Sequence, residues 1–387
     1  MKSGKLLMLF FVLANLLSQA ITLSDSARIS LLTCGPGMEL YSAFGHTGIR
    51  VTDYKQDFDV VFNYGTFDFE QPGFYTNFVK GKMRYMLAVE SYRGFLQQYM
   101  YEERSVSEQE ILITPEQKQI VFELLEVNSR PENREYYYDF FWDNCATRPR
   151  DIFEKALGSA LRYDTAAGNF EHNKTMHDML RIFVQDRPWV DYGFDLILGL
   201  NCEIEATPRH QTFLPLYLAR YLDCAQLNGK PFTGRPKLIL DAPFYYKSIH
   251  LFTPWLLNTV LLLFALALTY FEIKHNKHHV WFDVGFFFIL GIIGSLFLAL
   301  WIFSSHFSVP RNLNLLWLLP PHLLVAFFLP RAKKTGWMRI YFLLTICLSF
   351  MILAGWWISP QPFNTAIIPL LLIIILRSAI IRKFSRS

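Results

Sequence analysis

The sequence lacks the short motifs that mark metal and nucleotide chemistry. Its 387 residues include only five cysteines, none of them in a CxxC pair, and they contain no HExxH motif and no glycine-rich phosphate loop. Internal repeats and low-complexity tracts are also missing. Metal-dependent catalysis and nucleotide binding therefore have little support, and we expect neither a metal nor another cofactor.

Charge is sparse as well. Charged residues make up 18% of the chain, against 52% hydrophobic residues. The apolar excess is concentrated after residue 250, in five stretches that are each about long enough to cross a bilayer. We therefore expect five transmembrane helices within 251–381, at 251–271, 280–303, 313–330, 339–358 and 363–381.

Basic residues are distributed unevenly around these stretches. The loops at 274–279 and 331–339 and the tail at 382–386 are rich in Lys and Arg, whereas the opposite loops contain little beyond Arg311. The positive-inside rule places the basic loops in the cytoplasm and the preceding domain outside the membrane. Because these loops hold much of the basic excess, the net charge of +4 requires no nucleic-acid partner.

The N-terminus has the layout of a signal peptide. Lys2 and Lys5 precede the apolar run 6–17, which ends in Ser18-Gln19-Ala20. We expect residues 1–20 to be a signal peptide cleaved near Ala20, and an uncleaved anchor is the alternative. In either case residues 24–248 form the exported part of the chain.

The exported part has the pattern of a single α+β domain. Runs rich in β-branched and aromatic residues predict strands, and apolar residues spaced three and four apart predict helices. The expected strands are 28–33, 48–52, 59–64 and 83–90, and the expected helices are 91–102, 115–128, 146–157 and 175–185.

Cys145 is the candidate nucleophile of this domain. It follows an aromatic run and precedes the predicted helix 146–157, for which Asp143 and Asn144 are suitable N-cap residues. A helix N-terminus and a neighbouring imidazolium both lower the pKa of a thiol, so we expect a reactive thiolate here. The alternative is a buried structural cysteine.

His46 is the candidate general base. It lies between Gly45 and Gly48 at the start of a strand-like run, so that histidine precedes cysteine in the chain. A cysteine–histidine pair usually has a third residue that orients the imidazole. Asn63, on the following strand, is our choice, with Asp143 as the rival and a simple turn residue as the alternative reading.

Other polar residues are candidates for binding the substrate or its reacting oxygen. The backbone N–H of Cys145 is the expected oxyanion donor, and the side chain of Tyr41 is a possible second donor. Further candidate substrate contacts lie beside the thiol or at the outer ends of the second and third membrane stretches, where a wet interfacial loop or a solvent-exposed arginine is the alternative. These candidates are Asn144, Arg148, His306, Asn312 and Asn314.

The remaining cysteines have simpler interpretations. Cys202 and Cys224 are compatible with a disulfide in an exported domain, although their separation does not establish one. Cys347 falls within a membrane stretch. Cys34 is the alternative nucleophile, but it lies between a strand and a Gly-Pro-Gly turn and lacks a helix N-terminus.

The order of these parts resembles a circularly permuted papain-like domain, as in NlpC-like and lecithin-retinol acyltransferase-like proteins. More specifically, the chain resembles the Lnb family of bacterial lipoprotein N-acyltransferases over nearly all of its mature length. Five segments carry the resemblance: LLTCGPGMELYSAFGHTGIRV, VVFNYGTFDF, YYDFFWDNCATRPRDIF, FLPLYL and, among the membrane stretches, SSHFSVPRNLNLLWLLP.

This resemblance implies an acyltransferase in the bacterial inner membrane with its catalytic domain on the periplasmic or outer face. The acyl chain would move from a lipid donor, through a thioester on Cys145, to the α-amine of the diacylglyceryl cysteine of an apolipoprotein. The donor is either a phospholipid or the acyl chain of the lipoprotein itself. Two other functions stay open: an exported, membrane-anchored cysteine peptidase or amidase, and a non-catalytic membrane scaffold.

Overall fold

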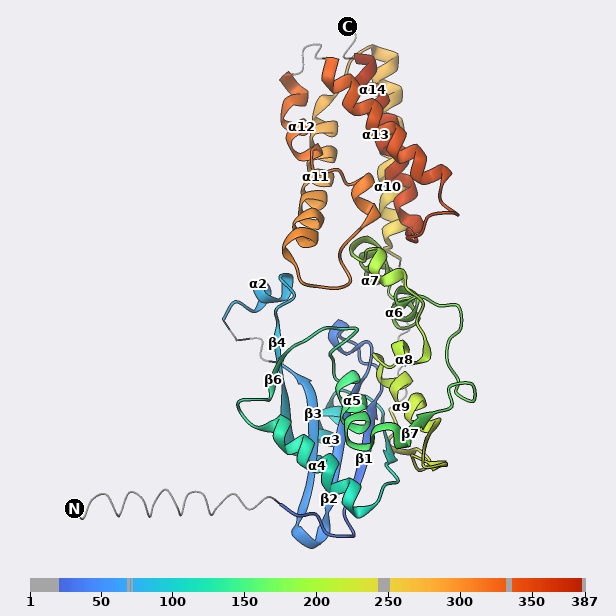
Figure 1. Ribbon diagram of the computed structural model, residues 1–387. Helices are drawn as coiled ribbons and strands as arrows, with labels where there is room; N and C mark the ends of the chain where they lie inside the picture. Colours follow the sequence, from blue (N-terminus) through green and yellow to red (C-terminus); the bar gives the residue numbers. More distant parts are fainter. Residues whose placement is uncertain (1–20, 68–69, 71, 243–250, 332–335, 385–387) are drawn as a thin grey trace, which may run out of the picture.

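The computed structural model describes residues 21–67, 70, 72–242, 251–331 and 336–384. The predicted signal peptide, residues 1–20, lies outside this part of the chain. The described residues form an α+β domain with an antiparallel sheet, followed by a helical membrane domain. The two domains are stacked end to end in Figure 1.

A seven-stranded antiparallel sheet forms the centre of the first domain. The four strands expected from the sequence are present to within two residues at each end. Three short strands, which the sequence pattern did not reveal, extend the sheet to the order β10-β5-β1-β2-β3-β4-β6. The strands are β1 Arg28–Cys34, β2 His46–Asp53, β3 Phe58–Thr66, β4 Arg84–Ser91, β5 Val106–Glu110, β6 Glu135–Tyr137 and β10 Lys237–Leu240.

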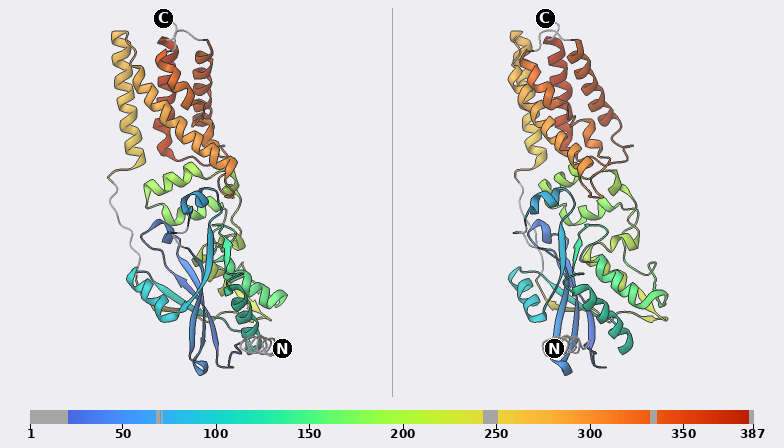
Figure 2. Two further views of the ribbon diagram at one scale, coloured as in Figure 1. Left: turned by 90° about the vertical axis from the view of Figure 1, so that its left-hand side faces the viewer. Right: turned by 60° about the vertical axis from the view of Figure 1, so that its left-hand side comes forward.

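Helices cover both faces of this sheet (Figures 1 and 2). Successive strand residues point to opposite faces, so Leu31 packs in the core beneath α4 (Pro115–Ser129) and α5 (Thr147–Leu157). Leu32 instead packs against α3 (Tyr92–Tyr101) on the other face. A short helix, α2 (Phe74–Val79), lies at the end of the sheet nearest the membrane domain.

The second half of this domain is mostly helical and has a core of its own. Met176, Met179 and Phe213 are buried in it. Its helices α6 (Met176–Val184) and α7 (Pro188–Ile197) lie between the sheet and the membrane domain in Figure 1, whereas α8 (Pro208–Gln211) and α9 (Pro215–Asp223) lie beside the sheet. A small second sheet contains β7 (Leu161–Tyr163), β8 (Ala225–Leu227) and β9 (Lys230–Pro231).

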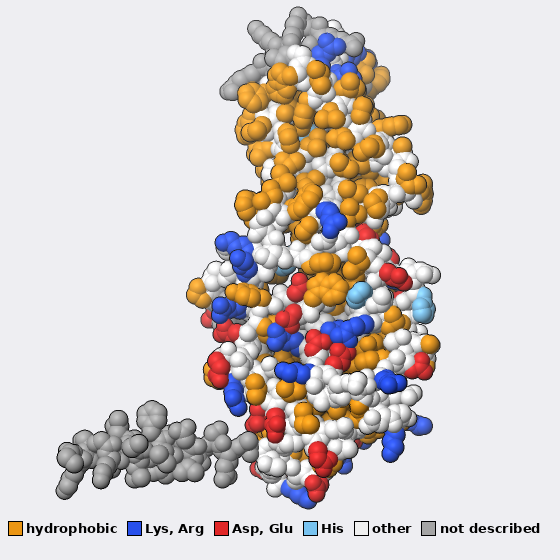
Figure 3. Space-filling view, in the orientation of Figure 1, with side chains coloured by type: hydrophobic (Ala, Val, Ile, Leu, Met, Phe, Trp, Pro, Cys, Tyr) orange, Lys and Arg blue, Asp and Glu red, His pale blue; other side chains and the backbone are white. Residues whose placement is uncertain are grey.

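Four helices in the described part of the membrane domain are long and apolar enough to span a bilayer. They are α10 (Pro254–His275), α11 (Val280–Phe303), α13 (Gly336–Ala354) and α14 (Ile368–Phe384) together with the preceding turn η7 (Thr365–Ile367). The apolar part of α14 is 61% buried, against 22–28% for the other three, so α14 is the central helix. Figure 3 shows apolar side chains over the visible face of the bundle, with Lys and Arg side chains near its far end.

The stretch 313–330, expected to be a single membrane helix, is broken into shorter pieces. These are the turns η5 (Leu313–Leu316) and η6 (Leu329–Arg331) on either side of α12 (His322–Phe328). Pro320 and Pro321 lack the N–H groups that a continuous helix needs, which explains the break. The chain nevertheless passes from the domain side of the bundle to its far side along these pieces (Figure 1), which keeps the expected sidedness of the loops.

Two glycines of α11 accommodate the broken segment. A Cβ atom on Gly291 would overlap the backbone of Leu323, and one on Gly294 would overlap the backbone of Leu318. Small residues at such positions let two membrane segments approach to backbone contact.

Candidate active site

Cys145 lies in the turn that leads into α5, and Asn144 holds this turn in place. The Oδ1 atom of Asn144 accepts hydrogen bonds from the backbone N–H groups of Ala146 at 2.8 Å and Thr147 at 2.9 Å. Its Nδ2 atom donates to two backbone carbonyls of neighbouring segments. Asn144 is buried and its amide is fully engaged, so the structure gives it a positioning role beside the thiol.

His46, at the first position of β2, is oriented by a chain of hydrogen bonds. Its Nε2 atom lies 2.6 Å from Oδ1 of Asn63 on β3. Nδ2 of Asn63 donates to Oε1 of Glu90 on β4 at 2.7 Å. Because a carboxylate only accepts hydrogen bonds, this contact turns Oδ1 of Asn63 toward the imidazole. Neutral His46 therefore carries its proton on Nε2, which leaves Nδ1 as the basic nitrogen.

Gly65 shows that the thiol and the imidazole border the same small space. A Cβ atom built on Gly65 would lie 3.2 Å from Cβ of Cys145 and 3.7 Å from Cε1 of His46. Gly65 also has a φ of +89°, which disfavours any other residue. The missing side chain keeps the space between nucleophile and base free.

Thr47, the neighbour of His46, contacts Cys145 directly. Its hydroxyl donates a hydrogen bond to the backbone carbonyl of Cys145. Thr47 also lowers the pKa of the Cys145 thiol, against the larger effect of burial. Strand β2 thus supplies the imidazole and a residue that contacts the nucleophile.

The electrostatics of the pair differ from the sequence-based expectation of a thiolate. Burial raises the pKa of Cys145 to about 11, although the hydrogen bonds from Thr47 and the backbone N–H of Cys145 oppose this. Burial also lowers the pKa of His46 to about 4, against a smaller opposing effect of Asn63. At neutral pH the resting pair is therefore a neutral thiol beside a neutral imidazole, and the base must remove the proton as the sulfur attacks.

The pH dependence of thiol alkylation tests this assignment. With a pKa of about 11, only about one Cys145 thiol in 10⁴ is ionised at pH 7. We expect iodoacetamide labelling of Cys145, followed by peptide mass spectrometry, to accelerate about tenfold per pH unit up to about pH 10. Labelling that is already maximal near pH 7 would show a resting thiolate–imidazolium pair instead.

All five cysteines lie in the described residues and are free thiols. The disulfide considered for Cys202 and Cys224 is therefore not formed in this structure. Cys34, the alternative nucleophile, is the cross-strand partner of His46. Its side chain is buried against α3 with Tyr99, and burial raises its pKa to about 12.

Arg148 makes contacts within the protein rather than standing free. Its guanidinium pairs with both carboxylate oxygens of Asp143, at 2.5 and 2.8 Å, and lies over the ring of Tyr136. Asp143 thus forms this ion pair, and Asn144 rather than Asp143 caps the turn.

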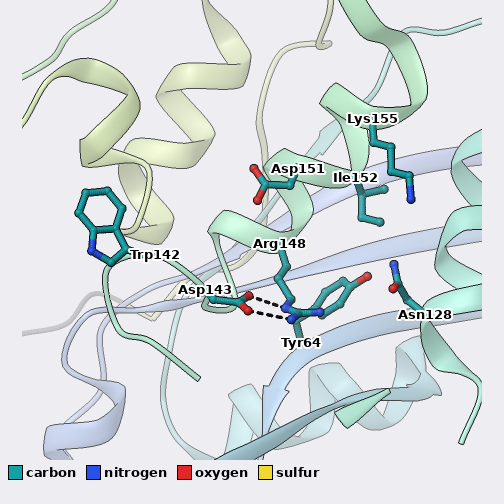
Figure 4. A pocket seen from close by; sticks show the side chains of 8 residues that line it. All are labelled: Tyr64, Asn128, Trp142, Asp143, Arg148, Asp151, Ile152 and Lys155. Carbon is teal, nitrogen blue, oxygen red and sulfur yellow. Dashed lines mark hydrogen bonds and ion pairs between the residues drawn. The ribbon is translucent and has the colours of Figure 1, made fainter. Parts of the chain in front are cut away.

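Arg148 also borders a cavity of about 360 Å³. Figure 4 shows the residues that line this cavity: Tyr64, Asn128, Trp142, Asp143, Arg148, Asp151, Ile152 and Lys155.

Residues 304–312, here called the outer loop, connect α11 to the broken segment and contact the catalytic domain. Nε2 of His306 lies 2.7 Å from the carbonyl oxygen of Phe78 in α2. Phe307 contacts Trp142 in the segment that leads to Cys145, with 5.3 Å between ring centroids. His306 therefore joins the two domains near the candidate site.

Asn312 and Asn314 also join the two domains. Nδ2 of Asn312 donates to the carbonyl oxygen of Leu196 at 2.7 Å, and Nδ2 of Asn314 donates to that of Asp195 at 2.9 Å. Both carbonyls belong to the last turn of α7. Nε2 of Gln361, after α13, donates in the same way to the carbonyl of Leu198. The amides of Asn312 and Asn314, expected to contact substrate, thus bind the end of a helix.

A buried histidine supports this junction from the catalytic domain. His177 lies between Asp195 and Glu203, with 2.8 Å from each ring nitrogen to a carboxylate oxygen. Burial alone would lower the pKa of His177, but its close contacts with the carboxylates of Asp195 and Glu203 raise it to about 9. His177 is therefore charged at neutral pH and fixes Asp195, which also accepts a hydrogen bond from Asn364.

The structure brings together three of the residues selected from the sequence, namely Cys145, His46 and Asn63. Tyr41 is 61% exposed, and its ring makes an edge contact with Phe67, at 6.5 Å between ring centroids. Sequence reasoning missed Thr47 and Glu90. Strand alternation could have indicated Glu90 only if the pairing of β3 with β4 had been known, because Glu90 lies on a different strand from its partner Asn63.

Comparisons with known proteins give two family matches. A model described as the Lnb N-terminal periplasmic domain matches residues 17–181, and a model described as the Lnb transmembrane domain matches residues 246–387. Searches of curated proteins and of solved structures found no significant match. The first matched region contains Cys145, His46, Asn63, Thr47 and Glu90, and the second contains the whole membrane domain.

Proposed function

The chain belongs to the Lnb family of multi-pass membrane proteins with a periplasmic N-terminal domain, and from this premise we propose that it is a thiol-dependent lipoprotein N-acyltransferase. The acyl acceptor is the α-amine of a diacylglyceryl cysteine at the N-terminus of an apolipoprotein. The acyl donor is a glycerol ester in the same membrane leaflet, either a phospholipid or the lipoprotein itself. The periplasmic domain is proposed to be a circularly permuted papain-like fold.

One observation carries this proposal: the hydrogen-bonded series Glu90–Asn63–His46 ends beside the thiol of Cys145. A nucleophile, a base and a residue that orients the base form the arrangement used for covalent acyl transfer. Trp142, three residues before Cys145, contacts Phe307 of the outer loop, and this contact supports a site close to the outer end of the membrane helices.

The first half-reaction forms a thioester. Nδ1 of His46 takes the proton of the Cys145 thiol while the sulfur attacks the ester carbonyl of the donor. The sulfur–carbon bond forms, the ester carbon–oxygen bond breaks, and the leaving glyceryl alkoxide receives the proton from His46. The backbone N–H of Cys145 is the proposed donor to the ester oxygen on which negative charge develops, because the N–H groups of Ala146 and Thr147 are already bound to Asn144.

The second half-reaction transfers the acyl group to nitrogen. The neutral α-amine attacks the thioester carbonyl, the carbon–nitrogen bond forms and the carbon–sulfur bond breaks. His46 accepts the proton lost by the amine and returns it to the Cys145 sulfur. The neutral resting pair is then restored, so the cycle needs no cofactor.

Mass spectrometry of the full-length protein in lipid membranes tests this function. Incubation with a diacylglyceryl lipopeptide is expected to give an N-acylated lipopeptide and an acyl adduct on the peptide that contains Cys145. The number of glyceryl-linked chains left on the product identifies the donor: one fewer chain means that the lipopeptide donated its own chain, and an unchanged number means that a phospholipid did.

Two outcomes would contradict the acyltransferase. Cleavage of the peptide, or release of free fatty acid without N-acylation, would indicate the membrane-anchored hydrolase. An unmodified lipopeptide together with an unmodified Cys145 would indicate the scaffold.

A further inference from the structure

The short helix α2 lies at the membrane surface. The backbone N–H of Ser305 donates to the carbonyl oxygen of Lys80 at 2.9 Å, immediately after α2, and His306 contacts the carbonyl of Phe78. Ser305 is two residues beyond the end of the membrane-spanning helix α11. Because α2 is bonded directly to the segment that follows a membrane span, its exposed side chains lie close to the outer end of that span.

The exposed side chains of α2 are unusually apolar for a surface helix. Tyr75 is 80% exposed, Phe78 is 54% exposed and Val79 is 52% exposed. Aromatic side chains are favoured at the level of lipid head groups. The next two basic residues, Lys80 and Lys82, are exposed as well, which suits a surface of lipid phosphates.

A row of aromatic rings runs from α2 toward the thiol. Phe74 of α2 lies 6.1 Å from Phe67, Phe67 lies 4.9 Å from Tyr85, and Tyr85 stacks on Tyr138 at 4.1 Å, all measured between ring centroids. These four residues are here called the aromatic row. All four residues are half-buried.

The row ends at the nucleophile. Tyr85 and Tyr138 both pack against the core cluster that contains Cys145. Burial, and then the charge of an ionised Cys145, raise the pKa of Tyr85 to about 12, as expected for a phenol close to the thiol. One continuous set of apolar surfaces thus connects the bilayer interface with Cys145.

Resting on the proposed function, we propose that the aromatic row is the binding track for the transferred acyl chain. Its occupant is a single fatty acyl chain, esterified to glycerol, that enters over α2 and lies along Phe67 and Tyr85 with its carbonyl carbon at Cys145. The row supplies apolar contact along the length of the chain, and the polar site around His46 and Thr47 holds only the ester. The row therefore determines which chain lengths are transferred.

Chain-length preference tests the track. The rate of acyl-adduct formation on Cys145 is measured with donors that differ only in having a medium or a long saturated chain. In Phe67→Ala and Tyr85→Ala the ratio of the two rates is expected to change by about tenfold relative to wild type. Tyr101→Ala is the matched control, because Tyr101 is a tyrosine on α3 that is 90% exposed and outside the row. Unchanged iodoacetamide labelling of Cys145 shows that each variant retains the folded site.

Photo-crosslinking tests occupancy without turnover. The full-length Cys145→Ala variant is exposed in membranes to a phospholipid or a diacylglyceryl lipopeptide that carries a photoreactive group along one acyl chain. Crosslinks are expected in the tryptic peptides 56–80 and 85–93, which contain Phe67, Phe74 and Tyr85, and the lipid that gives them identifies the source of the chain. The peptide 94–104 of α3 should remain unlabelled.

The results of these two experiments test the acyl-chain binding track and the proposed acyltransferase function separately. Crosslinks in the row without any N-acylation by the wild type would support the track and refute the acyltransferase. N-acylation with crosslinks confined to the membrane helices, or with a chain-length ratio unchanged in both variants, would overturn the track and leave the acyltransferase standing.

Discussion

Replacing Cys145 with alanine is expected to abolish both the acyl adduct and the N-acylated lipopeptide, a loss of at least about 10³-fold in rate. The sulfur of Cys145 forms the covalent bond to the acyl group in the proposed mechanism. Alanine has no nucleophilic atom at this position. The change removes one atom from a side chain that is 7% exposed, so the fold should survive. Product formation is measured by mass spectrometry in membranes containing equal amounts of each variant.

Cys34→Ala is the matched control for this experiment. Cys34 is also a buried free thiol and is the cross-strand partner of His46, but its side chain packs against α3. We expect it to retain most of the activity, because its loss leaves a small cavity and no change in the reacting groups. Full activity in Cys145→Ala with loss in Cys34→Ala would move the nucleophile to Cys34.

Replacing His46 with alanine is expected to slow adduct formation by about 10² to 10⁴-fold without abolishing it. The thiol remains, but with a pKa of about 11 it has no base to remove its proton at neutral pH. This variant should therefore recover activity as the pH rises toward 11. The wild type should instead lose activity only near pH 4, where His46 becomes protonated and can no longer act as a base.

A conservative change of the orienting residue gives the control for this prediction. Asn63→Leu removes the hydrogen bond to Nε2 of His46 and leaves Glu90 without its partner, so the imidazole is present but no longer fixed. Its loss of rate should be smaller than that of His46→Ala, with the alkaline recovery absent or weak. Equal rates in wild type and His46→Ala across the whole pH range would remove His46 from the mechanism.

The parts of the site that could be predicted from the sequence are those that local pattern determines. His46 and Asn63 fall on strands with clear β-type composition, and Cys145 precedes an amphipathic helix, so their residue types and elements were both readable. Their proximity depends on β2 pairing with β3 and on α5 packing over both strands. The family resemblance, rather than the pattern, suggested that proximity.

The ionisation of the pair could not be predicted, because it depends on burial. A cysteine at a helix start next to a histidine suggests a thiolate. The backbone N–H of Cys145 does favour the ionised thiol, but His46 is itself neutral at neutral pH and adds no positive charge. Burial of Cys145 outweighs the effect of the N–H and gives a neutral thiol. The extent of burial follows from how the aromatic residues around the turn pack, which local sequence does not specify.

Asn312 of the outer loop and Asn314 of η5 illustrate a different limit of prediction from sequence. Asn312 and Asn314 stand beside membrane stretches on the side of the catalytic domain, which suits a substrate site and a domain junction equally well. Their partners are backbone carbonyls of α7, more than 100 residues earlier. Any sequence of α7 presents such carbonyls, so no side-chain pattern in α7 could have revealed the contact.

Because of these hydrogen bonds, the C-terminal end of α7 is stabilised by residues of both domains. The last carbonyls of a helix have no partners within it and need capping from outside. Here the caps for Asp195, Leu196 and Leu198 come from Asn314, Asn312 and Gln361 of the membrane domain. A periplasmic domain made without residues 251–387 would therefore fray at α7 and loosen Asp195 from His177. We expect the last turn of α7 to become fully hydrogen-bonded only when the membrane part has assembled, so that the folding of the two domains is coupled.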